Sequence, residues 1–375
     1  MIKGENFNIP NTKARILVAP LDWGLGHATR CIPVISALIQ QHCTVIVAAE
    51  DQQKVLLQKE FPNLQFIDLK GYRVQYSSYK FWMSTKLLLQ LPKILYRIYA
   101  EKKWLKRAVI ENKIDAVIAD NRMGLSHKKI PCVYITHQLT IKTGNRFTEN
   151  IARKIHYHYI NKFKSCWVPD AKDTLNLAGE LSHPVTLPKI PVSYLGPLSR
   201  FEKKEVVSKY DLCVILSGPE PQRTVFEKII LQGLYKAEGK SMLVRGLPGK
   251  TEIAESDNSS VEIKNHLSAN ELNNIIQQSN IVISRCGYST VMDLVKLQKK
   301  AILVPTPGQT EQEYLGGYLQ EQKLFYCVDQ DRFSLSGAIK NSQAFEFTTW
   351  SVQEDVYKCV IENFVEALKI DNVNT

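Results

Sequence analysis

The sequence predicts a two-domain α/β protein in which each domain holds a parallel sheet covered by helices. Its 375 residues exceed the roughly 250–300 residues that a single hydrophobic core usually supports. Short apolar segments with the composition of buried strands alternate with helical segments, which is typical of parallel sheets. The net charge of +11 also divides unevenly along the chain, which favours two domains with different partners.

The basic residues belong to the first half of the chain. Residues 1–200 carry 29 Lys and Arg against 14 Asp and Glu, a balance of +15. Residues 201–375 carry 19 against 23, a balance of −4. An excess of positive charge attracts acidic partners such as nucleic acid or an anionic membrane. We therefore expect such a partner to contact the first half.

The first half opens with an apolar strand at residues 15–19, a loop containing glycine, and a helix predicted over residues 28–41. The strands that follow are short, apolar and rich in β-branched residues, which indicates a sheet buried on both faces. They are expected at residues 44–48, 64–68, 114–119, 132–136 and 165–168.

The second half repeats this pattern. A strand at residues 211–216 leads through Ser217 and Gly218 into a helix over residues 222–234. The later strands are expected at residues 241–244, 261–264, 281–283, 301–304 and 324–328, with helices at 268–278, 288–297 and 310–322.

Proline and glycine within residues 195–200 mark the join between the halves. The domains are therefore predicted as residues 1–199 and 200–375, and the final helix, residues 351–369, is expected to cover either one. Both halves begin with strand, glycine loop and helix, which predicts two Rossmann-like domains. Such sheets bind ligands at the carboxyl ends of their strands, so we expect the site in the cleft between the domains.

The ends of the chain and its cysteines bear on location and metal chemistry. The first eleven residues are polar and include Glu5, so no secretory signal is expected. No apolar run approaches the roughly 18 residues that span a bilayer. The eight cysteines are never closer than twelve residues apart, which excludes a CxxC zinc or redox pair. We expect a cytoplasmic protein with reduced thiols.

Gly24, Gly26 and His27 lie between the first strand and its helix. Glycines here let backbone N–H groups approach an anion at the helix N-terminus, and His27 is a candidate general base because imidazole titrates near neutral pH. The alternative is a tight turn without a ligand, with His27 in a capping or packing role. The spacing is not the full GxGxxG fingerprint, which disfavours a nicotinamide cofactor.

The run from Ser284 to Asp293 is the most specific motif in the chain. Gly287 permits close backbone approach, and Ser289 and Thr290 supply hydroxyls at a predicted helix start. Asp293 lies one turn further on the same face, where a carboxylate can accept two vicinal ribose hydroxyls. A Ser/Thr cap followed by an acidic residue is the alternative. That alternative does not explain Arg285 together with the glycine.

Two other helix starts in the second half carry polar residues. Ser217 and Gly218 provide a hydroxyl and backbone amides that suit a phosphate, although a generic turn explains them equally well. Gln312 and Glu313 begin the helix after the strand at residues 301–304, where they can contact sugar hydroxyls or form an ordinary solvated turn.

A basic, aromatic stretch at residues 79–113 accounts for much of the charge of the first half. Between Lys70 and Lys113 there are eleven Lys and Arg against only Glu101 and Glu111. Apolar residues recur at helical spacing, and Pro92 is expected in the first turn of a helix. Basic amphipathic helices with interfacial aromatics bind anionic membranes, whereas a core-facing helix with a solvated basic back is the alternative. No nucleic-acid-binding motif accompanies the stretch, so we expect no nucleic acid partner.

Together these motifs resemble the GT-B glycosyltransferases, most closely those of family 28, typified by the N-acetylglucosaminyltransferase that makes lipid II. The resemblance spans about residues 15–325. Gly24 to His27 is similar to the first glycine loop of the family with its histidine. Residues 135–138 resemble a His-Glu-Gln run, with His137 at the glutamate position. Residues 196–200, ending at Arg200, resemble a Gly-Asn-Pro-Val-Arg join.

The second half carries the closer match to the family. Ser217 and Gly218 resemble the end of a Gly-Gly-Ser loop, and His266 and Leu267 fall where main-chain groups hold uracil. The run from Ser284 to Asp293 resembles the donor-binding Ser-Arg-x-Gly-x-x-Thr motif, in which glutamate binds the ribose. Gln312 and Glu313 resemble a Gln-Gln pair that contacts the donor sugar.

The resemblance implies a GT-B fold, with two Rossmann-like domains facing across a cleft, and an inverting hexosyltransferase. It implies transfer of GlcNAc or a related hexose from a UDP-sugar to a hydroxyl of a lipid-linked or other glycan acceptor. His27 is the predicted base, with Asp120 and His137 as rivals. No cofactor or metal is expected, because amides, helix N-termini and arginine can offset the leaving-group charge. The implied donor-binding residues are Arg200, Ser217, Gly218, His266, Leu267, Arg285, Gly287, Ser289, Thr290, Asp293, Gln312 and Glu313.

Three alternatives remain open at this point: a UDP-sugar hydrolase, a non-hydrolysing 2-epimerase on the same fold, and a non-catalytic nucleotide-sugar-binding protein. The basic stretch predicts a peripheral position on the inner face of the cytoplasmic membrane.

Overall fold

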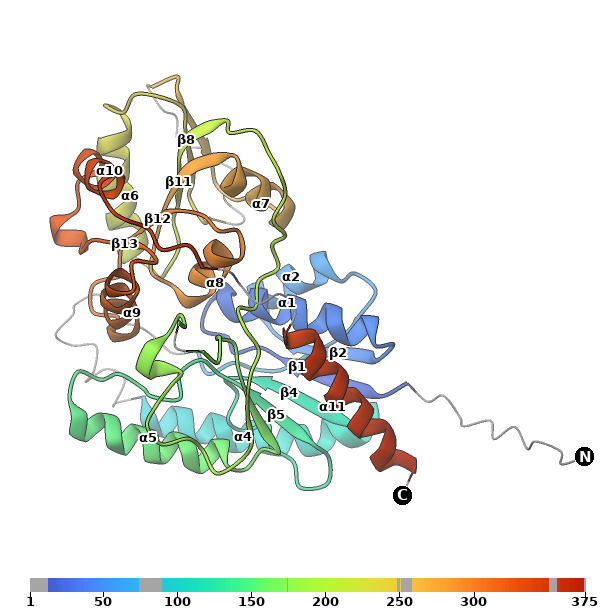
Figure 1. Ribbon diagram of the computed structural model, residues 1–375. Coiled ribbons are helices and arrows are strands. Elements are labelled where there is room, and N and C mark those ends of the chain that lie inside the picture. The colour runs from blue at the N-terminus through green and yellow to red at the C-terminus, as the bar shows by residue number, and fades with distance from the viewer. Residues whose placement is uncertain are drawn as a thin grey trace, which may run out of the picture.

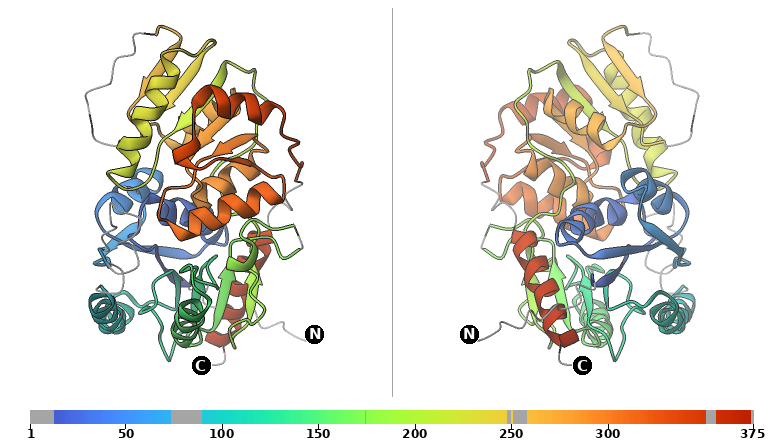
Figure 2. Two further views of the ribbon diagram at one scale, coloured as in Figure 1. Left: turned by 90° about the vertical axis from the view of Figure 1, so that its left-hand side faces the viewer. Right: turned by 90° about the vertical axis from the view of Figure 1, so that its right-hand side faces the viewer.

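The protein has two domains, each built around its own parallel sheet, and the C-terminal domain lies above the N-terminal domain in Figures 1 and 2. The computed structural model describes residues 13–73, 90–173, 175–247, 250, 258–350 and 356–373. Within these residues the two predicted α/β halves are present as two sheets, each covered by helices.

The N-terminal sheet has seven parallel strands in the order β3-β2-β1-β4-β5-β6-β7. The strands are β1 (Arg15–Ala19), β2 (Thr44–Ala49), β3 (Gln65–Asp68), β4 (Ala116–Asp120), β5 (Cys132–Ile135), β6 (Ser165–Val168) and β7 (Val192–Tyr194). The described helices of this part are α1 (Leu25–Gln40), α2 (Asp51–Glu60), α4 (Leu91–Asn112), α5 (Arg146–Ile160) and the short 3-10 helix η2 (Gly179–Leu181).

The C-terminal sheet has six parallel strands in the order β10-β9-β8-β11-β12-β13. They are β8 (Tyr210–Ile215), β9 (Ser241–Val244), β10 (Val261–Lys264), β11 (Ser279–Ser284), β12 (Ala301–Leu303) and β13 (Tyr326–Cys327). The helices are α6 (Gln222–Leu234), α7 (Ala269–Gln277), α8 (Tyr288–Lys296), α9 (Thr310–Glu321), α10 (Leu335–Gln343) and the 3-10 helix η3 (Gln330–Arg332).

The last helix, α11 (Val356–Val373), returns to the N-terminal domain and lies along it (Figure 2). The Phe364 ring meets Trp167 of β6 edge-on at 5.4 Å. Ile361 and Val365 are fully buried. The N-terminal domain is therefore built from residues at both ends of the chain. The first five residues of the predicted final helix, 351–355, lie outside the described residues.

Several element boundaries shift by a few residues from the prediction, and two differences matter for the description of the N-terminal domain. The predicted N-terminal series of strands ends at residue 168, but β7 adds a further edge strand. It has only three residues, all of them partly buried, and is too short to leave an apolar signal. Helix α1 begins at Leu25 rather than residue 28, because Gly24 takes a φ of 89° and serves as its N-cap. His27 therefore lies in the first turn of the helix.

Helix α4 begins at Leu91 with Pro92 in its first turn, as predicted. Its inner face is anchored by a buried ion pair, in which Arg122 Nη1 donates to Glu101 Oε1 at 3.0 Å. Tyr72 and the backbone of Gly124 donate to the other carboxylate oxygen. This network holds the basic helix against the sheet. Residues 79–89 of the basic stretch lie outside the described residues, and none of the described helices is both long and apolar enough to cross a membrane.

Replacing Glu101 by Ala should destabilise the fold by about 3–5 kcal/mol, because it leaves the buried Arg122 guanidinium without its counter-ion. Chemical denaturation monitored by circular dichroism measures this loss. Glu111→Ala, on the exposed side of the same helix, is the matched control and should change the free energy of unfolding by less than about 0.5 kcal/mol. Equal effects of the two substitutions would contradict the anchoring role of the pair.

Candidate active site

The carboxyl ends of the strands in the two sheets carry most of the predicted site residues. In the N-terminal domain they follow β1, β4 and β5, and in the C-terminal domain they follow β8, β10, β11 and β12. The residues at these strand ends in one domain are in direct contact with those in the other. Ser289, at the start of α8, donates its hydroxyl to the Gly26 carbonyl at 3.0 Å, and Tyr288 donates to the Pro169 carbonyl at 2.7 Å. The predicted cleft is therefore closed by direct contacts at these points.

The contact between Gly26 and Ser289 depends on the glycine. A Cβ at residue 26 would lie 2.8 Å from the Ser289 hydroxyl oxygen, which is closer than side chains pack. A glycine at this position lets the N-terminal loop approach the start of α8. Gly24, by contrast, has open space around it, and its role is the positive φ at the N-cap of α1.

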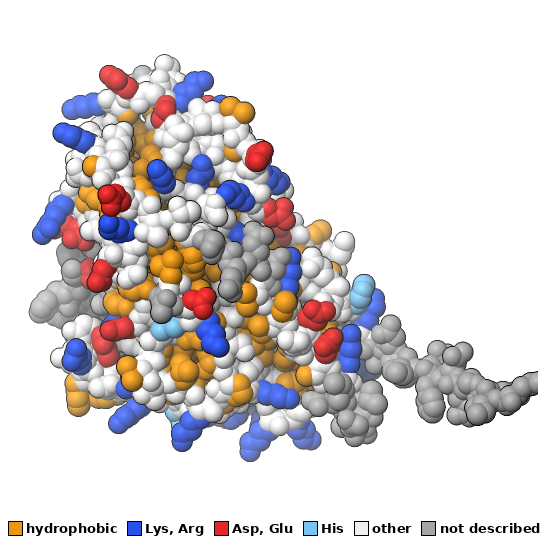
Figure 3. All heavy atoms as spheres, in the orientation of Figure 1, with side chains coloured by type: hydrophobic (Ala, Val, Ile, Leu, Met, Phe, Trp, Pro, Cys, Tyr) orange, Lys and Arg blue, Asp and Glu red, His pale blue; other side chains and the backbone are white. Residues whose placement is uncertain are grey.

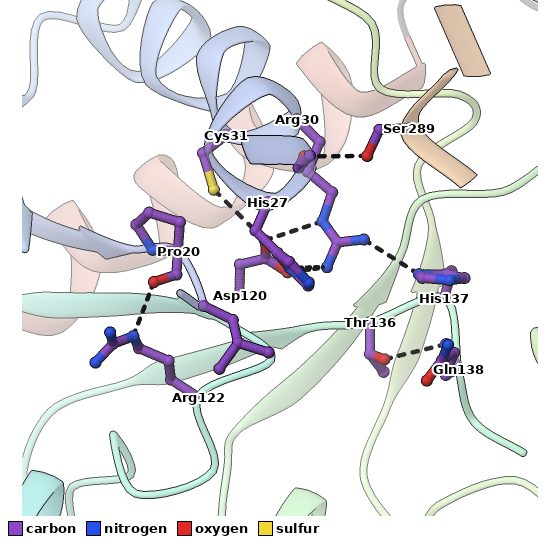
Figure 4. Close-up of polar contacts among 12 residues, drawn as sticks. Pro20, His27, Arg30, Cys31, Asp120, Arg122, Thr136, His137, Gln138 and Ser289 are labelled. Carbon is purple, nitrogen blue, oxygen red and sulfur yellow. Dashed lines mark hydrogen bonds and ion pairs between the residues drawn. The ribbon is translucent and has the colours of Figure 1, made fainter. Parts of the chain in front are cut away.

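The three candidate catalytic residues of the N-terminal domain lie together (Figure 4). His27 Nδ1 lies 3.0 Å from Asp120 Oδ2. Arg30, one turn further along α1, donates through Nε to Asp120 at 2.9 Å and through Nη2 to the second carboxylate oxygen. The third nitrogen of the guanidinium, Nη1, lies 3.1 Å from His137 Nδ1. Arg30 thus connects all three predicted residues.

The charged groups of this cluster shift one another's pKa strongly. Burial raises the pKa of Asp120, but Arg30 and His27 outweigh it and bring the pKa down to about 2. Burial and then Arg30 lower the pKa of His27, which Asp120 opposes only in part. At neutral pH Asp120 is therefore ionised and His27 is neutral. A neutral imidazole beside a carboxylate is the form that can accept a proton.

Two groups approach the same nitrogen of His27. Besides Asp120 at 3.0 Å, Arg30 Nη2 lies 2.8 Å from Nδ1. With its proton on Nδ1, His27 donates to Asp120 and leaves Nε2 with a free lone pair. With its proton on Nε2, Nδ1 accepts from Arg30 instead. Only the first tautomer can remove a proton from a substrate through Nε2.

A carboxylate of the C-terminal domain reaches this cluster. Glu311, in the first turn of α9, lies with Oε1 2.7 Å from Nε2 of His137. The His137 ring also stacks on Tyr288 of α8, with centroids 4.1 Å apart and planes 4° from parallel. His137 therefore contacts two elements of the other domain. A further hydroxyl, that of Thr310, donates to the Lys142 carbonyl at 2.7 Å across the same boundary.

Asp293, the predicted ribose carboxylate, lies in α8 next to the segment that joins the domains. Ser199 of that segment donates its hydroxyl to Asp293 Oδ1 at 2.5 Å. Burial raises the pKa of Asp293 to about 6, against the opposing effects of Ser199 and Arg200. Arg200 has a buried Nε without a hydrogen-bond partner among the described residues. A carboxylate and an incompletely bonded guanidinium thus lie near each other at the edge of the second sheet.

Arg285 is buried, and its predicted contact with the donor stays a prediction. Its guanidinium donates to the main-chain carbonyls of Val304, Pro305 and Gln222 and to the Gln330 side chain, and it lies 4.2 Å from the Phe226 ring centroid. With no carboxylate among these partners, desolvation lowers its pKa to about 10. In this arrangement Arg285 ties together the loops after β11 and β12 and the start of α6.

The other predicted donor residues occupy the same edge of the sheet. Gln312 Oε1 accepts from the Thr306 amide at 2.9 Å, and Glu313 Oε1 accepts from the Gly308 amide at 3.0 Å. Both side chains therefore organise the loop before α9. Their predicted contacts with a donor sugar stay predictions. Ser217, Gly218 and His266 are exposed, Leu267 is buried, and Gly287 and Thr290 are partly buried at the start of α8.

Two residues of the cluster were missed from the sequence. Arg30 lies three residues after His27, and i, i+3 spacing on a predicted helix was a usable signal. Glu311 immediately precedes Gln312, but its pairing with His137, 174 residues away, left no sequence signal.

Comparisons with known proteins agree with this architecture. Residues 234–348 match the Glycosyltransferase family 28 C-terminal domain. Among solved structures, the chain is similar to CalG4, the calicheamicin glycosyltransferase, with a TM-score of 0.61 and 12% identity over 97% of this chain and 95% of the other. SnogD from Streptomyces nogalater gives 0.58 and 10% over 96% and 95%. MurG from Acinetobacter baumannii gives 0.53 and 13% over 96% and 95%.

A sequence comparison with curated proteins found no match. The structural similarities extend over nearly the whole chain and show the GT-B fold of glycosyltransferases. The resemblance to family 28 found in the motifs is confirmed for the C-terminal domain. The fold and the domain match together support glycosyl transfer as the class of reaction.

Proposed function

We propose that this protein is an inverting glycosyltransferase. It transfers GlcNAc or a related hexose from a UDP-sugar to a hydroxyl of a lipid-linked or other glycan acceptor. The observation that carries the proposal is the pairing of neutral His27 with ionised Asp120, directly across the domain boundary from the start of α8. A base on one domain and the predicted nucleotide motif on the other are what a direct displacement requires.

In this mechanism His27 Nε2 accepts the proton of the acceptor hydroxyl as its oxygen attacks the anomeric carbon. Asp120 orients the imidazole through Nδ1 and stabilises the imidazolium that forms. The bond between the anomeric carbon and the donor phosphate breaks on the opposite side, so the configuration inverts and UDP leaves. The N-terminus of α8 and the backbone amides after Ser217 offset the charge on the departing diphosphate.

The proposal includes no metal ion. The chain contains one Asp-x-Asp sequence, at Asp329 and Asp331 in and beside η3. Between them, Gln330 accepts a hydrogen bond from the buried Arg285. In the proposal, helix N-termini and backbone amides supply the positive potential that offsets the charge of the leaving diphosphate.

We further propose that helices α4 and α5 rest on an anionic membrane where a lipid-linked acceptor is found. Both helices lie on the side of the N-terminal domain away from the C-terminal domain (Figure 1). Tyr96, Tyr99 and Ile110 of α4 are strongly exposed, and Lys103 and Lys106 share the same face. Lys and Arg side chains line this lower edge of the molecule in Figure 3.

Helix α5 extends that surface with a stripe that the sequence analysis did not single out. Phe147, Ile151 and Ile155 recur at four-residue spacing and are exposed, with Phe147 at 72%. Lys154 lies beside them. Exposed apolar residues framed by lysines suit the boundary between headgroups and acyl chains better than they suit water.

The central test is transfer itself, with UDP-GlcNAc and lipid-linked or soluble glycan acceptors, in the wild type and in His27→Ala. We expect kcat to fall by about 100-fold or more in the variant while UDP affinity is retained, because the substitution removes the base and leaves the C-terminal domain intact. His42→Asn is the matched control, since His42 is exposed with a positive φ that asparagine tolerates.

Three outcomes of this test contradict the proposal. UDP release without any acceptor indicates a hydrolase. A changed sugar configuration on the nucleotide indicates an epimerase. Nucleotide binding without turnover in the wild type, across all acceptors, indicates a binding protein.

The affinity for UDP-GlcNAc should depend on pH through Asp293. Its pKa of about 6 means that the carboxylate, which accepts the ribose hydroxyls in the proposal, becomes protonated below that pH. Affinity should therefore be constant above about pH 7 and weaken towards about tenfold per unit well below pH 6. Isothermal titration calorimetry measures this.

UDP-GlcNAc is the right ligand for that titration because its diphosphate diester does not titrate in this range. Asp293→Asn should bind more weakly at neutral pH and lose the dependence below pH 6. A variant that keeps the wild-type pH profile would show that another group is responsible, such as His266, which lies near Arg200.

The double variant Lys103→Gln, Lys106→Gln should bind anionic liposomes about 30-fold more weakly than the wild type in co-sedimentation at low salt. Each lysine near the surface contributes about 1 kcal/mol. Lys228→Gln, Lys236→Gln removes the same charge from exposed positions of the C-terminal domain and should leave binding unchanged. Equal losses in the two variants, or no binding by the wild type, would remove the membrane surface from the proposal.

A further inference from the structure

The loop that follows β6 in the N-terminal domain is held in shape by one buried carboxylate. Asp170 is completely buried. It accepts hydrogen bonds from the amides of Leu177 and Ala178, at 2.8 and 3.0 Å, and from the hydroxyl of Ser182 at 2.6 Å. Several bonds to a single fixed side chain leave the backbone between these residues little freedom. Residues 176–182, called loop 176–182 below, therefore form a rigid surface at the domain boundary.

Helix α9 of the C-terminal domain lies next to this surface (Figure 1) and contacts it through two tyrosines. The Tyr314 hydroxyl accepts a hydrogen bond from the Glu180 amide at 2.7 Å, and Tyr318 donates its hydroxyl to Asn176 Oδ1 at 2.9 Å. The two rings are stacked, with centroids 6.2 Å apart and planes 6° from parallel. A Cβ at Gly179 would lie 2.5 Å from the Tyr314 hydroxyl oxygen and 2.9 Å from the Tyr318 ring. The two tyrosines thus fit against the loop without room for a side chain between them.

The docked face of α9 extends back to its first residue. Thr310, Tyr314 and Tyr318 recur every four residues, so they share one face of the helix. Thr310 donates to the Lys142 carbonyl. The Lys142 ammonium lies 4.9 Å from the centroid of the Tyr314 ring and 2.5 Å from the Glu180 carboxylate. Successive turns of one helix face therefore rest on the N-terminal domain.

The beginning of the same helix also organises the loop that precedes it. Gln312 and Glu313 accept hydrogen bonds from the amides of Thr306 and Gly308, and these two side chains are the predicted contacts of the donor sugar. A residue two positions along a helix lies about 200° around its axis, which places Gln312 opposite the docked face. One helix thus carries the predicted sugar contacts and rests on the domain that carries His27.

We propose that Tyr314 and Tyr318 are positioning residues, which dock α9 on loop 176–182 and thereby set the place of the donor sugar relative to His27. The proposal rests on the function proposed above and names residues to which neither the motifs nor the family match assigns a role. Reacting atoms must lie about 3–3.5 Å apart, so a small displacement of α9 lowers the rate of transfer. The predicted nucleotide contacts lie on other elements, in α8 and after β8 and β10, so the same displacement leaves UDP bound.

Hydrogen exchange followed by NMR tests the docking without any substrate. In Tyr314→Phe the Glu180 amide loses its acceptor across the boundary, and we expect this amide to exchange at least about 10-fold faster than in the wild type. The Leu177 amide is the internal control. Its acceptor is Asp170 of the same domain, so its exchange rate should not change. An unchanged exchange rate of the Glu180 amide would overturn the docking.

Gly179→Ala tests the consequence for transfer. The added methyl group forces the two rings to turn away or α9 to shift, and either movement breaks their bonds to the loop. We expect kcat to drop about 10-fold and the affinity for UDP to change less than about 3-fold. Gly144→Ala is the matched control, because Gly144 also has a positive φ, 82° against 50°, but has no atom within 4 Å of an added Cβ. It introduces the backbone strain alone and should keep the wild-type kcat.

Tyr318→Phe is the conservative variant, since it keeps the ring and removes only the hydroxyl that reaches Asn176. Its kcat should fall about 3-fold, between the values of the wild type and Gly179→Ala. Thermal unfolding of each variant checks that the fold is retained, and Tyr318→Phe carries the kinetic test if Gly179→Ala unfolds. Weaker UDP binding with unchanged kcat would overturn the proposal, because it would place the tyrosines in donor binding. Equal losses of kcat in Gly179→Ala and Gly144→Ala would also overturn it.

The two readouts separate this inference from the proposed function. A wild type without transferase activity, in which the Glu180 amide still responds to Tyr314→Phe, would refute the function and keep the docking of α9. An active transferase whose kcat is the same in Gly179→Ala and Tyr318→Phe as in the wild type would keep the function and refute the positioning role.

Discussion

The ion pair between Arg30 and Asp120 is the interaction on which the site depends. Both side chains are almost completely buried, at 3% and 0% exposed, so each would be costly there without the other. Two bonds from the guanidinium saturate one face of the carboxylate and keep it ionised. The carboxylate then has a lone pair left for His27, and the guanidinium has a nitrogen left for His137. One buried pair thereby orients two histidines from different parts of the N-terminal domain.

The sheets explain why these residues meet. His27 and His137 follow β1 and β5, and Asp120 is the last residue of β4; these strands are neighbours in the sheet order. Parallel strands end at one edge, so residues separated by about a hundred positions in the chain become adjacent without any long loop. The second domain uses the same geometry for the ends of β8, β11 and β12. Gly26 then lets the two edges come into hydrogen-bonding contact.

Much of this could be predicted from the sequence, because parallel sheets leave strong local signals. Apolar strands, glycine turns and helix starts predicted two α/β domains and the strand ends that carry His27, Asp120 and His137. The rest depends on contacts across the domain boundary. Nothing near Glu311 in the sequence indicates that it reaches His137, and the inward orientation of Arg285 follows from carbonyls on three other loops. Motif matching identifies which residues lie at an edge, whereas side-chain partners are set by packing.

The positive charges of the basic half of the chain fall into two groups, buried and exposed, which the net charge alone does not distinguish. Arg30 and Arg122 are buried and act as the fixed partners of Asp120 and Glu101. Lys103 and Lys106 are exposed beside tyrosines on the outer face of α4. Burial raises the pKa of Glu101 even though Arg122 is next to it, so that pair serves to fix the helix in place more than to add net stability. A helix fixed in this way presents its outer lysines at a constant distance from His27, so in the proposed function a membrane bound at α4 would lie at a fixed distance from the proposed base.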